Sequence, residues 1–361
     1  MLRTIGIMVI ISLLFTSGCG FKDIDKRFFV VAIGVDKGKE KNYEVSIKLV
    51  IPSSAIEPGK SKFQVVSREA DSISEALQTL NSEVDKELDM GHTKMIIISR
   101  ELGNEKVPEV LNGFMRRRDI QRIEYLALGE PSAKAILETN PKSERLASNS
   151  LFLIFGDEGT ESPFIVTEYL YDFYKRMLEH GKDPFLPIIN IREDRFEINR
   201  VSIFNKEKMV MTLSSEETAI FSQLAHKHSN IEIEASEGDK RYALSVDDYD
   251  YSYNFSDSNL ENPKINMDVT IKTIAVESNQ PLFDKDWSEL EVIVEKQIKD
   301  RYMSLLEEMK MNKVDPIGFG LRYLATHQNG DQDWEKWKKI YPKVEFNINV
   351  NVTLKGTGAI K

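Results

Sequence analysis

Apolar residues in the first half of the chain form short runs and helical stripes that alternate. Phe28 to Val35 is a continuous apolar run, typical of a strand covered on both faces. From Val45 to Ile51 apolar residues alternate with more polar ones, which predicts a half-buried strand. Ser72 opens a capping-box pattern. The apolar residues that follow it recur three or four apart, as on one helix face: Ile73, Leu77, Leu80, Val84 and Leu88.

The same alternation continues to about residue 181. Strands are expected at Met95–Ile98 and Ile123–Leu128, and short helices at Pro108–Met115 and Ala133–Leu137. Ser162-Pro163 predicts the start of an amphipathic helix, because a cap and a first-turn proline precede an apolar stripe that ends at His180-Gly181. This half of the chain therefore indicates a mixed sheet with helices on it.

A proline-marked connection, Pro184 to Pro187, is expected to lead into the second half. Val201–Phe204 and Met209–Leu213 resemble a hairpin, and Ser214 to Glu217 predict the cap of a short helix. The polar, tyrosine-rich segment 229–262 is expected to hold strands and loops.

The longest helix signal starts after Asp284 or Asp286 and stops near Asn312. Gly318-Phe319-Gly320 follows and is expected to be flexible. Six apolar positions then alternate strictly from Val344 to Leu354, which makes this the least ambiguous strand in the chain.

These patterns predict an α+β (mixed α/β) fold of several mixed sheets with helices packed on them, in two to three domains. A signal peptide is expected at residues 1–18, an N-terminal domain at 19–195 and a C-terminal domain at 196–361. A further division of the last domain near residue 250 is the alternative.

The first eighteen residues are typical of a secretory signal that ends at a lipidation site. Arg3 precedes the apolar stretch Ile5 to Phe15, which is shorter than the about 20 residues that a membrane-spanning helix needs. Small residues then precede Cys19, the only cysteine in the chain, whose thiol would take the lipid. The alternative is an ordinary signal peptide with an unmodified thiol, because Thr16 stands where an aliphatic residue is usual.

The charge balance excludes some partners. The formal net charge is −10, and removing residues 1–18 deletes Arg3 and no acid, which gives −10 − 1 = −11. An acidic protein repels phosphate backbones and anionic headgroups, so nucleic-acid binding is not expected. With Cys19 acylated, neither a disulfide nor a thiol-based site could form.

No catalytic or metal-binding constellation stands out, so neither an enzyme nor a cofactor is predicted. His226-x-His228 lacks a nearby third ligand, and a solvated loop is the better interpretation. His92 lies at a helix-to-strand junction without a Ser or Cys nucleophile motif, which favours a turn role. Gly318-x-Gly320 follows a helix instead of opening one, unlike a phosphate-binding loop.

Two groups of residues are candidates for a partner interface. Arg116, Arg117 and Arg118 form the only dense basic run, either as a solvated helix end or as a docking site for an acidic partner. Trp334 and Trp337 lie three apart on a short predicted helix, where they serve either as an exposed aromatic anchor or in helix packing.

The order of motifs resembles one family over nearly the whole mature chain. After Cys19 come the apolar strand ending in Gly34-Val35-Asp36, Gly91-His92-Thr93-Lys94 and the arginine run. They are followed near the end by Asp315 to Gly320, the two tryptophans and Gly356. This series resembles the Ger(x)C lipoproteins, the C subunits of nutrient germinant receptors in endospore-forming bacteria. Gly20-Phe21 departs from the family, which usually carries Trp directly after the lipidated cysteine.

The resemblance implies a non-enzymatic, lipid-anchored receptor subunit of mixed α/β domains on the outer face of the spore inner membrane. Its implied partners are a polytopic, transporter-like B subunit and an A subunit with a large soluble domain. Only Cys19 carries over as a functional residue, and its role is anchoring. Two alternatives remain: a solute-binding lipoprotein of a membrane transporter, with a ligand cleft between two lobes, and a lipid-anchored hydrolase.

Overall fold

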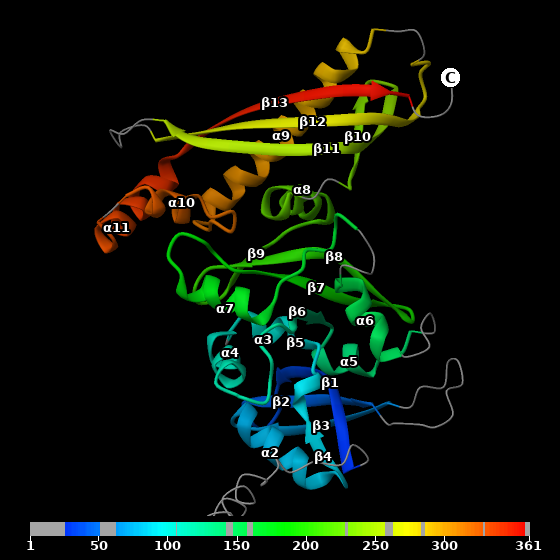
Figure 1. Cartoon of the computed structure of the whole chain (residues 1–361), viewed down its shortest axis with the longest axis vertical. Helices are drawn as coiled ribbons and strands as arrows, with labels where there is room; N and C mark the ends of the chain where they lie inside the picture. Colours follow the sequence, from blue (N-terminus) through cyan, green and yellow to red (C-terminus); the bar gives the residue numbers. More distant parts are fainter. Residues whose placement is uncertain are drawn as a thin grey trace, which may run out of the picture.

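Two β-sheets, one large and one small, lie one above the other along the long axis of the molecule (Figure 1). The computed structural model describes residues 26–50, 63–105, 107–141, 147–156, 162–227, 230–256, 263–282, 286–327 and 329–357. Helices cover the sheets and separate them, so the expected α+β fold with mixed sheets is confirmed.

The strands are β1 (Arg27–Lys37), β2 (Tyr43–Val50), β3 (Phe63–Ala70), β4 (Glu87–Asp89), β5 (Met95–Ser99), β6 (Tyr125–Glu130), β7 (Phe185–Arg192), β8 (Arg195–Phe204), β9 (Met209–Thr212), β10 (Glu232–Glu237), β11 (Lys240–Ser256), β12 (Lys264–Ser278) and β13 (Glu345–Gly356). The helices are α2 (Ile73–Glu83), α3 (Arg100–Gly103), α4 (Val107–Met115), α5 (Ala133–Glu138), α6 (Ala147–Phe155), α7 (Leu170–Leu178), α8 (Ser215–His226), α9 (Ser288–Met311), α10 (Phe319–Ala325) and α11 (Asp331–Ile340). Two 3₁₀ turns are η2 (Met90–His92) and η3 (Tyr341–Lys343).

The large sheet has the strand order β3-β2-β1-β5-β6-β7-β8-β9 in the described residues, with β4 paired to β1. Strands β1, β5, β6 and β7 run parallel, so their first residues meet at one edge of the sheet. Helices α2, α4 and α7 bury Leu80, Phe114 and Phe173 against one face, and α5 and α6 bury Ile136 and Phe155 against the other. The prediction that Phe28 to Val35 is a strand covered on both faces is confirmed.

Strand β2 is buried on both faces, so the half-buried strand expected here is wrong. Lys48 is only 4% exposed, and its Nζ donates to the Thr139 carbonyl at 3.2 Å. Helix α5 and the residue that ends it cover the face that the alternation assigned to solvent. The short polar residues in β2 therefore face protein instead of water.

Two helices are shorter than the apolar stripes predicted. Helix α2 ends at Glu83, and Leu88 lies instead in β4, which pairs with β1. Helix α7 begins at Leu170, well after Ser162-Pro163. The segment before α7 runs along β6, where Leu126 N donates to the Glu168 carbonyl at 2.9 Å. Sheet-type pairing with a distant strand therefore replaces the helix that the local pattern favoured.

The proline-marked segment is a strand and not a connection. Phe185 to Pro187 begin β7, which lies between β6 and β8 in the large sheet. The expected domain division at 195/196 falls between the first two residues of β8, which pairs with β7 on both sides of this point. The large sheet therefore continues through this position.

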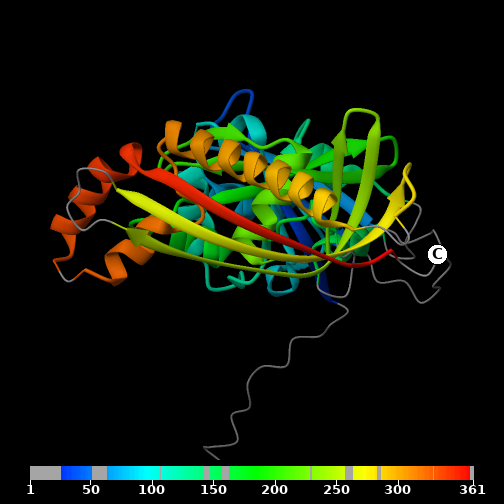
Figure 2. The same ribbon diagram turned by 90° about the horizontal axis from the view of Figure 1, so that it is seen from above.

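The small sheet has the order β10-β11-β12-β13 and includes a parallel pair, β12 with β13. Helix α9 contacts β13 and β10, and Figure 2 shows it running alongside β13. Helix α8, capped by the box that Ser214 and Glu217 form, separates the two sheets and contacts β8 and α9 (Figure 1). The expected long helix, hairpin β8–β9 and final alternating strand are confirmed.

Gly318 to Gly320 open a helix, whereas the sequence indicated a flexible stretch behind one. The buried Asp315 carboxylate accepts hydrogen bonds from the backbone N–H groups of Gly318, Phe319 and Gly320 at 2.8, 3.1 and 2.6 Å. A Cβ at Gly320 would lie 2.4 Å from Trp337 Nε1, so this position tolerates only glycine. The first donors of α10 are thus already satisfied from within the chain.

Candidate interaction surfaces

The arginine run lies directly after α4, at the edge of the large sheet where the parallel strands begin. Arg117 is half-buried and pairs with Asp119, whose Oδ1 accepts from Nε at 3.0 Å. Arg116 and Arg118 are exposed. The run follows the helix and does not form its last turn, so only part of it is available to a partner.

The loop that carries this run and the neighbouring start of α7 also expose apolar side chains. Ile123 is 69% exposed, and Tyr171, at the start of α7, is 50% exposed. The two residues are neighbours because Tyr171 N donates to the Arg122 carbonyl at 3.0 Å. We call the exposed residues of this surface the arginine edge; they are Arg116, Arg118, Arg122, Ile123 and Tyr171.

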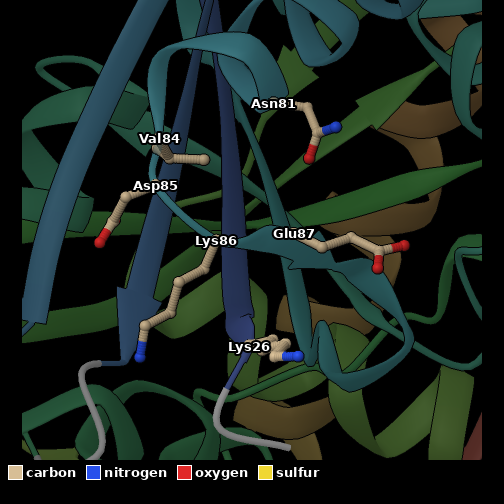
Figure 3. Close-up of a pocket in the computed structure, with 6 residues that line it drawn as sticks. All are labelled: Lys26, Asn81, Val84, Asp85, Lys86 and Glu87. Atoms are coloured by element: carbon tan, nitrogen blue, oxygen red, sulfur yellow. The ribbon is translucent and has the colours of Figure 1, made fainter. Parts of the chain in front are cut away.

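A shallow hollow lies at the start of β1 (Figure 3). Figure 3 shows Lys26 and Lys86 at the lower side of this hollow, while the carboxylates of Asp85 and Glu87 point to its two sides. Asn81 lines it from α2, and its Oδ1 accepts from Leu88 N at 3.1 Å, which fixes β4 against the helix. The hollow is open and polar, with charges of both signs.

The structure separates the two tryptophans that the sequence grouped together. Trp337 is 2% exposed and stacks on Tyr341 with ring centroids 5.5 Å apart, so it is a core residue. Trp334 is half-buried and stacks on His180, with centroids 4.9 Å apart. Lys338 lies over the same indole. Only Trp334 therefore offers an accessible ring.

Next to Trp337 lies a cleft of about 520 Å³ between the β11–β12 hairpin and helices α10 and α11. Phe255, Tyr323 and Trp337 form its aromatic wall, and Arg322 and Lys336 lie among its lining residues. The cleft lies within the small-sheet layer. A solute-binding lipoprotein would instead place its ligand between two lobes.

Burial raises the pKa of three acids in the described part of the chain to about 7, and no sequence pattern revealed them. Burial raises the pKa of Glu124 to about 7. Burial also raises the pKa of Glu168 to about 7, although Arg176 Nε donates to its Oε1 at 2.7 Å. The third is Asp315, which caps α10. The three acids lie at separate places in the fold.

The remaining candidates do not come together. His92 lies edge-on against Phe29, with ring centroids 4.7 Å apart, and His226 ends α8. His228 and Cys19 lie outside the described residues. Among the residues that the structure describes, no group of three His, Cys, Asp or Glu side chains could hold a metal ion. In the same residues, no helix has the length and apolar character needed to cross a membrane.

Comparisons with known proteins cover both halves of the chain. Residues 20–191 match the family described as spore germination protein N-terminal domain. Residues 199–358 match the family described as spore germination B3/GerAC like, C-terminal. The expected division at 195/196 lies between the two matches.

Similar proteins include spore germination protein GerQC of Bacillus cereus, which is 20% identical over 83% of this chain and 84% of its own length. Spore germination protein KC of Bacillus subtilis (strain 168) is 20% identical over 98% of this chain and 95% of its own length. The crystal structure of the GerBC protein matches with a TM-score of 0.58 and 15% identity, over 90% of this chain and 96% of that one. The shared fold and the two family matches show that the chain belongs to the Ger(x)C family of spore germination proteins.

Proposed function

We propose that this chain is the lipid-anchored, non-enzymatic C subunit of a nutrient germinant receptor, required for nutrient-triggered spore germination. The observation that carries the proposal is the pair of spore-germination family matches, which extend from residue 20 to residue 358. Two relatives that align over 84% and 95% of their own length carry spore germination names.

The proposed anchor is a lipid on Cys19. The matched N-terminal domain begins at residue 20, directly after this cysteine. This boundary supports removal of residues 1–18 by cleavage of the Gly18–Cys19 bond. Two acyl chains anchor a protein stably, whereas one binds reversibly. The protein would then sit on the outer face of the spore inner membrane.

The proposed partners are the A and B subunits of the receptor. Confinement to the same membrane raises the effective concentration of the subunits, so individually weak contacts can hold them together. Trp334, whose ring is accessible, is the proposed residue of the protein interface, and the arginine run, Arg116 to Arg118, lies on a different element of the fold. The proposed division of the chain near residue 195 follows the two family matches, which end at residue 191 and begin at residue 199, although the large sheet continues across this position.

A non-enzymatic role is supported by the packing of the histidines. His92, His180 and His327 each lie against an aromatic ring, of Phe29, Trp334 and Tyr323 respectively. The Thr326 hydroxyl lies 3.2 Å from His327 Nδ1, but it also lies 2.9 Å from the Tyr323 carbonyl, which the same imidazole nitrogen contacts at 2.7 Å.

Replacement of the cysteine tests the proposal. Cys19→Ser should move the chain from the spore membrane fraction to the soluble fraction and abolish the germination response to nutrients. Thr16→Leu is the matched control, because it restores the usual aliphatic residue and should leave the chain in the membrane fraction. Full nutrient-triggered germination in a strain that lacks this chain would refute the proposed role.

A further inference from the structure

The place where the chain enters the large sheet limits which surface can face the membrane. Six residues lie between Cys19 and Lys26, the first described residue, and the seven Cα-to-Cα steps that join them span at most roughly 25 Å. This step rests on the proposed lipid anchor at Cys19. With that anchor in the bilayer, the start of β1 lies close to the membrane surface.

The arginine edge is tied to the start of β1 by a chain of short contacts. Arg27, the first residue of β1, forms an ion pair with Asp89 at 2.8 Å. The Asp89 carboxylate accepts from Gly91 N at 3.0 Å, and the Gly91 carbonyl accepts from Gln121 Nε2 at 2.7 Å. Gln121 lies in the same loop as Arg118 and Arg122. The loop is therefore held beside the point where the anchor segment joins the fold.

The charge of the arginine edge is opposite to that of the whole chain. Arg116, Arg118 and Arg122 are exposed and form no ion pair within the residues that the structure describes. Lys26 and Lys86 add two cations beside the start of β1 (Figure 3). The net charge of −10 argues against an anionic surface as a general partner. Asp85 and Glu87 line the same hollow as these two lysines, so the exposed arginines carry the excess positive charge at this edge.

Exposed apolar side chains complete the surface. Ile123 and Tyr171 lie among these arginines and point to solvent. Arginine and tyrosine side chains place an apolar body and a polar tip at an interface between hydrocarbon and water. Clusters of Lys and Arg next to a membrane anchor bind anionic headgroups. We propose that the arginine edge rests on the anionic headgroups of the bilayer and fixes the orientation of the anchored protein.

A fluorescence experiment on the full lipidated chain in vesicles tests this orientation. With Cys19 acylated, an introduced cysteine is the only thiol available for labelling. Ile123→Cys places a fluorophore on the arginine edge, and Val276→Cys places one on the exposed surface of the small sheet. In vesicles that contain phosphatidylglycerol, headgroup-attached nitroxide lipids should quench the label at position 123 several-fold more than the label at position 276.

Charge reversal distinguishes the contribution of the arginine edge to membrane contact from that of the lipid anchor. Arg116→Glu/Arg118→Glu/Arg122→Glu should reduce quenching at position 123 to the level at position 276, while the protein still floats with the vesicles. The matched control, Lys240→Glu/Lys296→Glu/Lys299→Glu, changes the net charge equally on the small-sheet layer and should leave quenching unchanged.

Other outcomes overturn the proposal in distinguishable ways. A chain that floats with the vesicles but shows no selective quenching at position 123 refutes the membrane-facing edge and leaves the anchor intact. Protection of the position-123 label only after the A and B subunits are added would assign the edge to a protein partner. A chain that does not float refutes the lipid anchor and, with it, this orientation.

Discussion

Asp183 and Asp315 are joined by two reciprocal hydrogen bonds that connect the two layers of the molecule. Asp183 N donates to the Asp315 carbonyl at 2.9 Å, and Asp315 N donates to Asp183 Oδ2 at 2.7 Å. Asp183 precedes β7 of the large sheet, and Asp315 precedes α10 beside the small one. Because the Asp315 side chain also caps α10, a single residue supports both the junction and the helix.

Asp315→Ala should destabilise the protein by about 3 kcal/mol or more, because three buried backbone donors lose their acceptor. Urea unfolding of the variant and the wild type measures the difference. Asp331→Ala, which removes an exposed carboxylate from the first turn of α11, should change stability by no more than about 0.5 kcal/mol. Equal unfolding midpoints for Asp315→Ala and the wild type would contradict the role of this carboxylate.

Gly320→Ala should destabilise the junction through overpacking, because the added methyl group would lie 2.4 Å from Trp337 Nε1 and 2.8 Å from Gly181 Cα. Overpacked sites typically lose about 1–3 kcal/mol. Thermal unfolding tests this, with Gly356→Ala as the control, since a Cβ at Gly356 meets nothing within 4 Å. A neutral Gly320→Ala variant would show that α10 and α11 can move apart without cost.

The tryptophans should differ in their contribution to folding. Trp337→Ala removes a core ring and should cost about 3–5 kcal/mol. Trp334→Ala removes only the partly exposed stack on His180 and should cost about 1 kcal/mol. Equilibrium denaturation of both variants checks which of the two loses more stability. A larger loss for Trp334→Ala would mean that the exposed ring, and not the core ring, holds α11 in place.

Glu124 should make the protein less stable as pH rises. Burial raises its pKa from an ordinary value near 4.5 to about 7, so the folded state retains a proton that the unfolded state loses over this range. The stability that the protonated Glu124 side chain contributes is therefore complete below about pH 4.5 and is lost as the pH rises to 7. Above pH 7 the free energy of unfolding is lower by on the order of 3 kcal/mol.

Glu124→Gln should therefore stabilise the protein at pH 8 and have little effect at pH 4. Urea unfolding at the two pH values measures both differences. Glu101→Gln, at an exposed position, is the control and should show no such pH dependence. A Glu124→Gln effect of equal size at both pH values would show that folding does not raise the pKa of Glu124.

Local patterns predicted the elements whose periodicity agrees with their tertiary surroundings. Strand β13 alternates strictly because α9 covers only one of its faces, and the alternation records this directly. Helix α8 starts where its cap predicted because both halves of the capping box form. In these cases the local preference and the packing agree.

The elements that the sequence misassigned depend on contacts with distant residues. The segment after Ser162-Pro163 pairs with β6, and Pro187 lies within a strand because β6 and β8 flank it. Gly318 to Gly320 become ordered through Asp315 and Trp337, which no local pattern connects to them. Nonlocal hydrogen bonds outweigh local propensity at each of these sites.

The candidate interaction surfaces were only partly visible in the sequence. The run Arg116 to Arg118 is obvious as a charge cluster, but the exposure of Ile123 and Tyr171 beside it arises from the fold. The contact between Gly91 and Gln121, which places the loop beside β1, joins residues thirty positions apart. Glu124 lies within this region as one acid among many and gave no signal.

Purification of this chain from detergent-solubilised spore membranes after mild crosslinking tests the central claim most directly. A receptor C subunit should recover a polytopic membrane protein together with a second subunit that has a large soluble domain. The Cys19→Ser variant should recover neither, because the unanchored chain is no longer confined beside them. Recovery of an ATPase-linked permease in their place would contradict the receptor assignment and would favour a solute-binding lipoprotein.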